Sequence, residues 1–299
     1  MTIALRIDVD TFRGTRDGVP RLLAILAKRR IRGTWYMSLG PDNMGRHARR
    51  LIRPRFALKM LRSGAPSLYG WEILLRGTLW PGPVICTRLA ETVRLPDREG
   101  HEMGVHAWDH HHWQTGIDSL SDVQLDEQLT RATDALAQII GRRPTTAAAP
   151  GWRSTERSLA LPSSREFAFR SDSRGCAVPF LPLVHGSPLS QPQIPVDLPT
   201  YDEGVGRGAH ADAAWNVSLL ELISDGRPHV LTVHAESEGG AKSELFSQFL
   251  DRALAEGHEF EPLGEWLPRQ PSPAPRAIVK GTVAGREGWV CVHKGAAHQ

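Results

Sequence analysis

The sequence contains little cysteine and no long apolar run. Its three cysteines, Cys86, Cys176 and Cys291, lie far apart in a chain of 299 residues, and no Cys-x-x-Cys pair occurs. Neither a disulfide framework nor a thiolate zinc site is therefore predicted, and this spacing fits a reducing compartment. No stretch approaches the roughly 18 apolar residues that a membrane span requires, and the charged N-terminus lacks the apolar core of a signal peptide. We expect a cytoplasmic protein that does not span a membrane.

The sequence has no net positive charge outside one segment, which we call the basic arm (residues 42–63). Asp42 is its one acid, and its seven cations are Arg46, Arg49, Arg50, Arg53, Arg55, Lys59 and Arg62. The arm carries +6 whereas the whole chain carries only +3, so the remainder of the chain is net negative. Because the basicity is local, we expect an anionic partner at this arm and not over the whole surface.

Strand-like stretches alternate with helix-like stretches along the chain. The expected strands cover residues 3–9, 33–39, 102–107, 145–149 and 229–235. The expected helices include residues 19–30, 121–140 and 242–256. This alternation predicts βα units around a parallel sheet, open or closed into a barrel. We expect one catalytic domain over residues 1–267 and, after a proline-rich connector that starts at 268, a hairpin within residues 268–299 that packs on the same domain.

The alternation is interrupted after the second strand, which predicts an insertion over residues 41–98. Within it Met44, Ala48, Ile52, Phe56 and Met60 recur every four residues between arginines, as in a basic amphipathic helix that Pro54 would kink. Such a helix either lies on an anionic membrane surface or packs its apolar stripe on the domain with its arginines in water. The residues expected at a membrane are Arg46, Arg49, Arg50, Arg53, Arg55, Phe56, Lys59 and Trp71.

Acids and histidines fall where the expected strands end. Asp8 and Asp10 share one face of the first strand, His106 ends another strand with His110 four residues on, and His234 ends a third. The carboxyl ends of parallel strands meet at one edge, which is where such folds place their active sites. One carboxylate and two imidazoles leave open positions on a divalent zinc, cobalt or manganese ion, so the pattern predicts a catalytic metal site.

The remaining polar residues suggest acid-base parts. His234 has the chemistry to protonate a leaving amine, and Asp172, which follows another extended stretch, is expected to hold the tautomer of that ring. Taken alone, each residue also fits a structural role, as a satisfied core histidine or as a turn cap.

The order of these motifs resembles the NodB-like polysaccharide deacetylases. The motifs are Asp-x-Asp at 8–10, His-x-x-x-His at 106–110, Pro-Gly-Trp-Arg at 150–153, Ser-Asp at 171–172 and Leu-x-x-His at 231–234. Longer strings resemble one group within that family, the deformylases of 4-deoxy-4-formamido-L-arabinose linked to undecaprenyl phosphate. Those strings cover residues 7–15, 40–47, 68–71, 106–111 and 285–289. The resemblance implies a distorted (β/α) barrel and a role in lipid A modification, which gives resistance to polymyxin.

The resemblance also implies roles for single residues. Asp10, His106 and His110 would bind the metal, Asp8 would be the base and His234 the acid. In the wider family an arginine precedes the Pro-aromatic pair, whereas here Arg153 follows it. Arg153 is expected to orient Asp8, with Arg6 on the same strand face as its rival. Trp152, Trp108 and Asn43 are expected to contact the substrate, and Trp152 would wall a tight pocket that selects formyl.

The implied partners are a lipid-linked sugar and the anionic inner leaflet, with the enzyme peripheral on the cytoplasmic face of the inner membrane and no obligate protein partner. One alternative is a metal-dependent N-deacetylase of a soluble glycan, which the basic arm and the absent export signal disfavour. Another is a nucleic-acid-binding protein with a structural metal. Few aromatic residues interleave the arginines of the arm and no nucleic-acid motif occurs, so we expect no nucleic acid.

Overall fold

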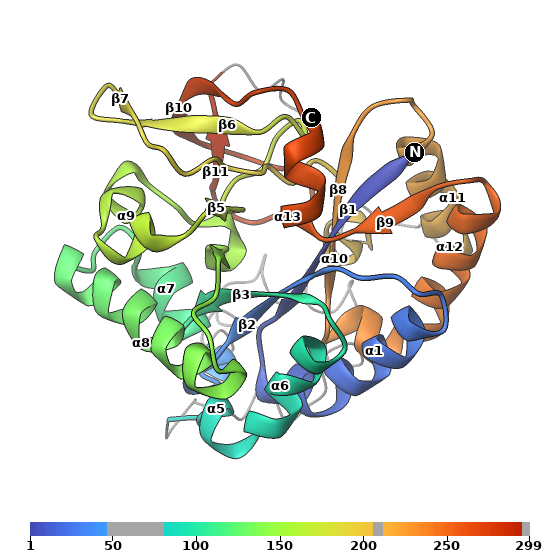
Figure 1. Cartoon of the computed structure of the whole chain (residues 1–299), viewed down its shortest axis with the longest axis horizontal. Coiled ribbons are helices and arrows are strands. Elements are labelled where there is room, and N and C mark those ends of the chain that lie inside the picture. Colours follow the sequence, from blue (N-terminus) through green and yellow to red (C-terminus); the bar gives the residue numbers. More distant parts are fainter. Residues whose placement is uncertain (47–80, 206–211, 295–299) are drawn as a thin grey trace.

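The computed structural model describes residues 1–46, 81–205 and 212–294. Its main sheet has the order β5-β4-β3-β2-β1-β8, with β9 also paired to β1, and every pairing is parallel (Figure 1). Its strands are β1 (Thr2–Val9), β2 (Thr34–Ser38), β3 (Glu102–Ala107), β4 (Thr146–Ala147), β5 (Phe169–Arg170), β8 (His229–His234) and β9 (Glu259–Glu261). Within the described ranges no pairing joins β5 to β8, so the barrel is open on that side. The predicted distorted βα barrel is confirmed.

The central strand β1 separates two environments. Residues 3–9 are all buried, and Ile3, Leu5, Ile7 and Val9 on one face belong to the main apolar core. The other face carries Arg6 and Asp8 toward the inside of the barrel. Because side chains alternate along a strand, a single segment builds both the core and the polar interior.

Helices cover the outer face of the sheet (Figure 1). The longest ones are α1 (Val19–Ala27), α6 (Ala90–Arg98), α8 (Asp122–Ile140), α11 (Asp212–Ile223) and α12 (Ser243–Ala255). Helix α8 begins at a capping box between Ser121 and Gln124 and ends at Gly141, whose φ is +77°. Its buried face repeats at helical spacing through Leu125, Leu129, Ala132, Leu136 and Ile139. Shorter helices are α5 (Ile85–Arg88), α7 (His110–Gly116), α9 (Glu156–Ala160), α10 (Tyr201–Val205) and α13 (Leu263–Trp266).

A second sheet, of order β11-β10-β6-β7, lies beside the barrel. Its strands are β6 (Phe180–Val184), β7 (Ser187–Pro188), β10 (Ala274–Gly281) and β11 (Val290–His293). The expected C-terminal hairpin forms from β10 and β11, although β10 begins inside the predicted connector. The hairpin is tied to the barrel because the Arg174 N–H, just past β5, donates to the Cys291 carbonyl at 2.8 Å.

The predicted insertion extends too far at its C-terminal end, because it includes a helix of the barrel. Helix α6 lies within residues 41–98, yet it packs on α1 and α8 as the crossover helix between β2 and β3, with Val93 in the main core. Most of the basic arm lies outside the described residues. No helix in the described ranges is long and apolar enough to cross a membrane.

Candidate metal centre and catalytic site

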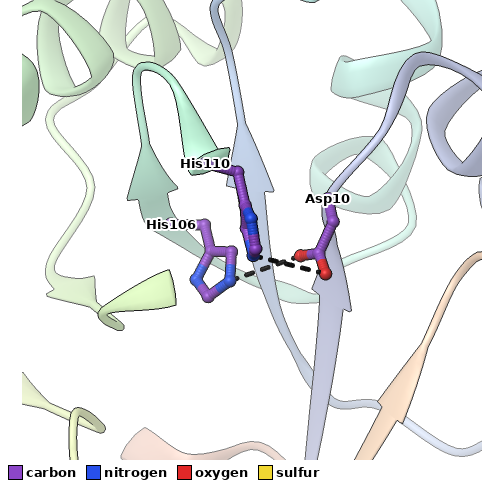
Figure 2. A group of neighbouring side chains, drawn as sticks. All are labelled: Asp10, His106 and His110. Carbon is purple, nitrogen blue, oxygen red and sulfur yellow. Dashed lines mark ion pairs between the residues drawn. The ribbon is translucent and has the colours of Figure 1, made fainter. Parts of the chain in front are cut away.

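Three side chains from the carboxyl ends of β1 and β3 converge on one point (Figure 2). His106 Nε2 lies 3.3 Å from Asp10 Oδ1, and His110 Nε2 lies 3.4 Å from Asp10 Oδ2. The ligand atoms of all three residues lie within 4.8 Å of one another. The sequence therefore placed the members of this cluster correctly on the fold.

Local contacts aim the two imidazoles. His106 Nδ1 hydrogen-bonds the Ala148 carbonyl at 2.8 Å, which leaves Nε2 as the free nitrogen facing Asp10. His110 begins α7, and Asp109 caps that helix by accepting from the His112 N–H at 2.9 Å. The cap fixes the backbone that carries His110, whereas the hydrogen bond to Ala148 fixes the His106 ring itself.

The residues present fit a divalent metal. Asp10 Oδ1 is buried and, among the described residues, has no hydrogen-bond donor, a costly state for a carboxylate that a cation would relieve. Burial lowers the pKa of His110 to about 4 despite the opposing charge of Asp10. The ring is thus neutral at physiological pH, which is the form that binds metal.

Glu236 supports Asp10 and was missed by the sequence reasoning. Its Oε1 accepts from the Asp10 N–H at 3.0 Å and from the Thr11 N–H and hydroxyl, both at 2.8 Å. A Cβ on Gly14 would lie 1.9 Å from this oxygen, so Gly14 makes room for the contact. A carboxylate two residues past a strand-end histidine was the available signal. Burial, reinforced by the charge of Asp10, raises the pKa of Glu236 to about 8.

Arg6, not Arg153, orients Asp8. The Arg6 Nε donates to Asp8 Oδ1 and its Nη2 to Asp8 Oδ2, both at 2.7 Å, and both side chains are buried. Burial is the largest single influence and would raise the pKa of Asp8, but the Arg6 charge and hydrogen bonds, together with the charges of His106 and His234, outweigh it and lower the pKa. Arg153 instead places its guanidinium 4.5 Å from the ring centre of Trp289. The expectation for Arg153 is therefore wrong, and the rival assignment to Arg6 describes the structure.

His234 lies beside Asp8 in the sheet register. Its backbone N–H donates to Glu238 Oε2 at 2.8 Å. Burial alone would lower the pKa of the imidazole, but the charges of Asp10, Asp202, Asp8 and Glu238 outweigh it and raise the pKa to about 9. His234 is therefore cationic at neutral pH, as an acid in this position must be.

Asp172 does not pair with His234, so that expectation is corrected. Its carboxylate binds the Arg170 Nε at 2.6 Å and the Gln193 Nε2 at 2.9 Å, and it accepts from the Ala149 N–H at 2.7 Å. Ala149 lies in the loop after β4 that runs on to Trp152. Asp172 thus positions that loop, and it acts on the site through the backbone that also carries the His106 contact.

The three residues expected at the substrate have other contacts. Trp152 is 1% exposed, so its ring has almost no surface with which to wall a pocket. Asn43 is buried, donating to Asp109 Oδ2 at 2.5 Å and accepting from the Gly82 N–H at 3.2 Å. Trp108 is half-buried beneath the guanidinium of Arg131, 4.3 Å from its ring centre. Direct substrate contact is least hindered at Trp108.

Of the residues expected at a membrane, only Arg46 is described, and its side chain is half-buried. The others lie outside the described residues. They are Arg49, Arg50, Arg53, Arg55, Phe56, Lys59 and Trp71.

Comparisons with known proteins agree with this geometry. A family model described as polysaccharide deacetylase matches residues 2–168. A protein of Shewanella sediminis described as a probable 4-deoxy-4-formamido-L-arabinose-phosphoundecaprenol deformylase, ArnD, is 42% identical over 96% of this chain and 93% of its own. A protein of the same description from Wigglesworthia glossinidia brevipalpis is 36% identical over 93% and 97%.

Among solved structures, a probable polysaccharide deacetylase from Pseudomonas aeruginosa PAO1 superposes with a TM-score of 0.59 at 14% identity, covering 91% of this chain and 92% of its own. At that identity the likeness speaks for the fold alone. With the sequence relatives, it places the chain in the polysaccharide deacetylase family, in the same group as the two ArnD relatives.

Proposed function

We propose that this protein is a metal-dependent amidohydrolase that removes the formyl group from 4-deoxy-4-formamido-L-arabinose linked to undecaprenyl phosphate. One observation carries the chemistry: the Asp10, His106 and His110 cluster lies beside a carboxylate held by Arg6 and a cationic His234. The substrate is the one for which the two ArnD relatives are named, and these relatives are similar over nearly the whole chain.

Asp10, His106 and His110 would hold one divalent ion. When bound, such an ion supplies a Lewis acid that acidifies a water and polarises the amide carbonyl. The chain's own part is to keep a carboxylate and two imidazoles in place. The Ala148 carbonyl holds the His106 ring, and Glu236 holds the backbone of Asp10.

Asp8 and His234 supply the proton transfers. Asp8, ionised because Arg6 lies against it, removes a proton from the attacking water as its oxygen bonds to the formyl carbon. His234 then gives a proton to the sugar nitrogen as the carbon–nitrogen bond breaks. Formate and the free 4-amino sugar result, with the sugar still on its lipid phosphate.

The acid form of His234 sets a pH limit on activity. Because the pKa of this imidazole is raised to about 9, the protonated form is fully present below that value and is lost as pH rises through it. We expect kcat/KM for formate release to fall above about pH 9. In Asp202→Asn, which removes one of the carboxylates that raise the pKa, the fall should begin at lower pH. Asp251→Asn, an exposed acid paired with Arg29, is the control and should leave the profile in place. A profile unmoved by Asp202→Asn would count against His234 as the acid.

The alternative, N-deacetylation of a soluble glycan, would use the same site. We expect the protein to release formate from the lipid-linked formamido sugar and no acetate from a soluble N-acetylated glycan. Acetate release alone would replace the deformylase proposal with the deacetylase.

The basic arm would bring the enzyme to its substrate. A lipid phosphate is held at the membrane, and clustered arginines are drawn to anionic lipid with about 1 kcal/mol each. We therefore place the enzyme on the cytoplasmic face of the inner membrane, held there peripherally.

Flotation with anionic liposomes checks this placement. Changing Arg49, Arg50, Arg53 and Arg55 to Gln should strongly reduce the floated fraction at physiological salt. A matched control removes the same charge elsewhere, from the exposed Arg16, Arg142, Arg227 and Arg269. Equal flotation of the two variants would contradict a membrane-binding role for the basic arm.

A further inference from the structure

The turn at residues 285–289 takes no part in the chemistry above, yet it is built tightly against the catalytic end of the sheet. Gly285 and Gly288 have φ values of +83° and +80°. A Cβ on Gly285 would lie 2.2 Å from the Glu203 carbonyl oxygen, and one on Gly288 would lie 2.4 Å from Arg153 Nη2. Neither position tolerates a side chain, so the turn packs against the barrel in one fixed position.

This turn places Arg286 against the loop that follows β4 at the carboxyl end of the sheet. The guanidinium carbon lies 4.6 Å from the ring centre of Trp152. Its Nη2 lies 3.1 Å from where a Cβ of Gly151 would stand. Gly151 and Trp152 belong to the loop after β4, in which Ala148 holds the His106 ring. Arg286 therefore borders the same loop that positions a candidate metal ligand.

Three guanidinium groups surround the indole of Trp152, and they are neutralised unequally. Arg6 is paired with Asp8 through two hydrogen bonds. Arg174 donates to both oxygens of Glu203 at 2.7 and 2.9 Å. Arg286 reaches only the first of these oxygens, at 3.2 Å. Two guanidinium groups thus share one carboxylate, and one positive charge is left over.

Exposure separates Arg286 from the other two. The side chains of Arg6 and Arg174 are 0% and 4% exposed, whereas that of Arg286 is 15% exposed. An arginine carries five N–H donors, and in the described part of the chain Arg286 uses one. The surplus charge therefore sits on the one group of the three that opens toward solvent.

We propose that Arg286 binds the phosphate of the lipid-linked sugar. The inference rests on the proposed function, because that substrate carries an anionic phosphate at the end of the sugar ring opposite the formamido group. A guanidinium binds phosphate through paired N–H donors, and partial burial strengthens the contact. Holding the phosphate at the rim selects which end of the ring enters the metal site.

Hydrolysis of two substrates tests the proposal. In Arg286→Gln we expect kcat/KM for the phosphate-bearing substrate to fall about 10- to 100-fold, the range for losing a charged hydrogen bond. Turnover of methyl 4-formamido-arabinoside, which has no phosphate, should be unchanged. Arg269→Gln, an exposed arginine paired with Glu261, is the control. Equal losses on both substrates, or no loss on either, would overturn the assignment.

Binding of farnesyl phosphate and farnesol in detergent judges the proposal without hydrolysis. The wild type should bind farnesyl phosphate more tightly than farnesol. Arg286→Gln should lose about 10-fold or more of that preference, and Arg286→Lys, which keeps packing and charge, should retain part of it.

An unchanged preference in Arg286→Gln would overturn the proposal even if the wild type released formate. Displacement by an equal concentration of inorganic phosphate would also overturn it, in favour of a free-anion site. If the wild type released formate from neither of the two formamido substrates, the proposed function itself would be wrong.

Discussion

Asp8→Asn should lower formate release by about 10²- to 10⁴-fold and yet leave the metal bound. An amide cannot accept the proton of the attacking water, but Asp8 is not one of the three converging ligands. Its Oδ2 lies 3.8 Å from His106 Nε2, farther than the 3.3 Å between that nitrogen and Asp10 Oδ1. Asp10→Asn should differ, because it weakens the ligand set itself and so loses metal and activity together. Metal content of the purified variants, measured beside their formate release, separates the two roles.

Asp17→Asn is the matched control for this pair, because Asp17 is a half-buried acid paired with Arg16 near the same end of β1. It should retain both metal and activity. Metal loss in Asp8→Asn with retention in Asp10→Asn would exchange the two assignments. Full activity in Asp8→Asn would remove the base from the account.

Arg6→Met should both destabilise the fold and inactivate the enzyme. The Asp8 carboxylate would remain buried without its partner, which costs about 3–5 kcal/mol when one half of a buried pair is removed. Arg6 also donates to Ser171 Oγ at 3.1 Å and lies 5.0 Å from the ring centre of Trp152. Its loss therefore disturbs the loop after β4 as well as the base.

The stability loss in Arg6→Met should depend on pH. In the wild type the pKa of Asp8 is lowered, so its contribution to stability is present above the unfolded value and is lost as pH falls through the folded value. Without Arg6, burial raises the pKa, and the protonated carboxyl is tolerated in acid. Urea unfolding at neutral pH and near pH 4 should show the largest gap between wild type and variant at neutral pH. A gap that widens in acid would contradict the pairing.

Strand ends were predictable from the sequence because alternation fixes which residues share a face and parallel sheets bring their carboxyl ends together. This is why Asp10, His106 and His110 could be gathered from positions about a hundred residues apart. The position of Glu236, two residues past a strand-end histidine, was a signal in the sequence. Its role as the acceptor for the Asp10 and Thr11 N–H groups depends on how the chain turns after β1, and the sequence pattern does not show that turn.

Partner choice among buried charges was less predictable. Asp172 was assigned to His234, but it binds Arg170, two residues before it on the same face. Arg6 and Asp8 form the same Arg-x-Asp pair on β1. The Arg-x-Asp pattern therefore occurs twice in the sequence, and each copy forms a local ion pair. The predicted long-range contact between Asp172 and His234 overlooked this pattern. Trp152 was expected to wall a tight pocket that selects formyl, whereas three arginines surround its ring.

The end of the insertion was misplaced for a different reason. Helix α6 contains Pro96 and carries several charges, so its sequence reads as part of an irregular segment. Its buried residues, Val93 and Pro96, are too few to give a clear helical period. Only its packing on α1 and α8 identifies it as a barrel helix.

The central claim is that a metal held by Asp10, His106 and His110 is required to release formate from the lipid-linked sugar. The measurement is formate release from synthetic 4-formamido-arabinosyl polyprenyl phosphate by the wild type, before chelation, after chelation and after return of zinc, cobalt or manganese. We expect formate at first, its loss on chelation and its recovery with metal. Formate release that persists in metal-free, folded protein would contradict the account.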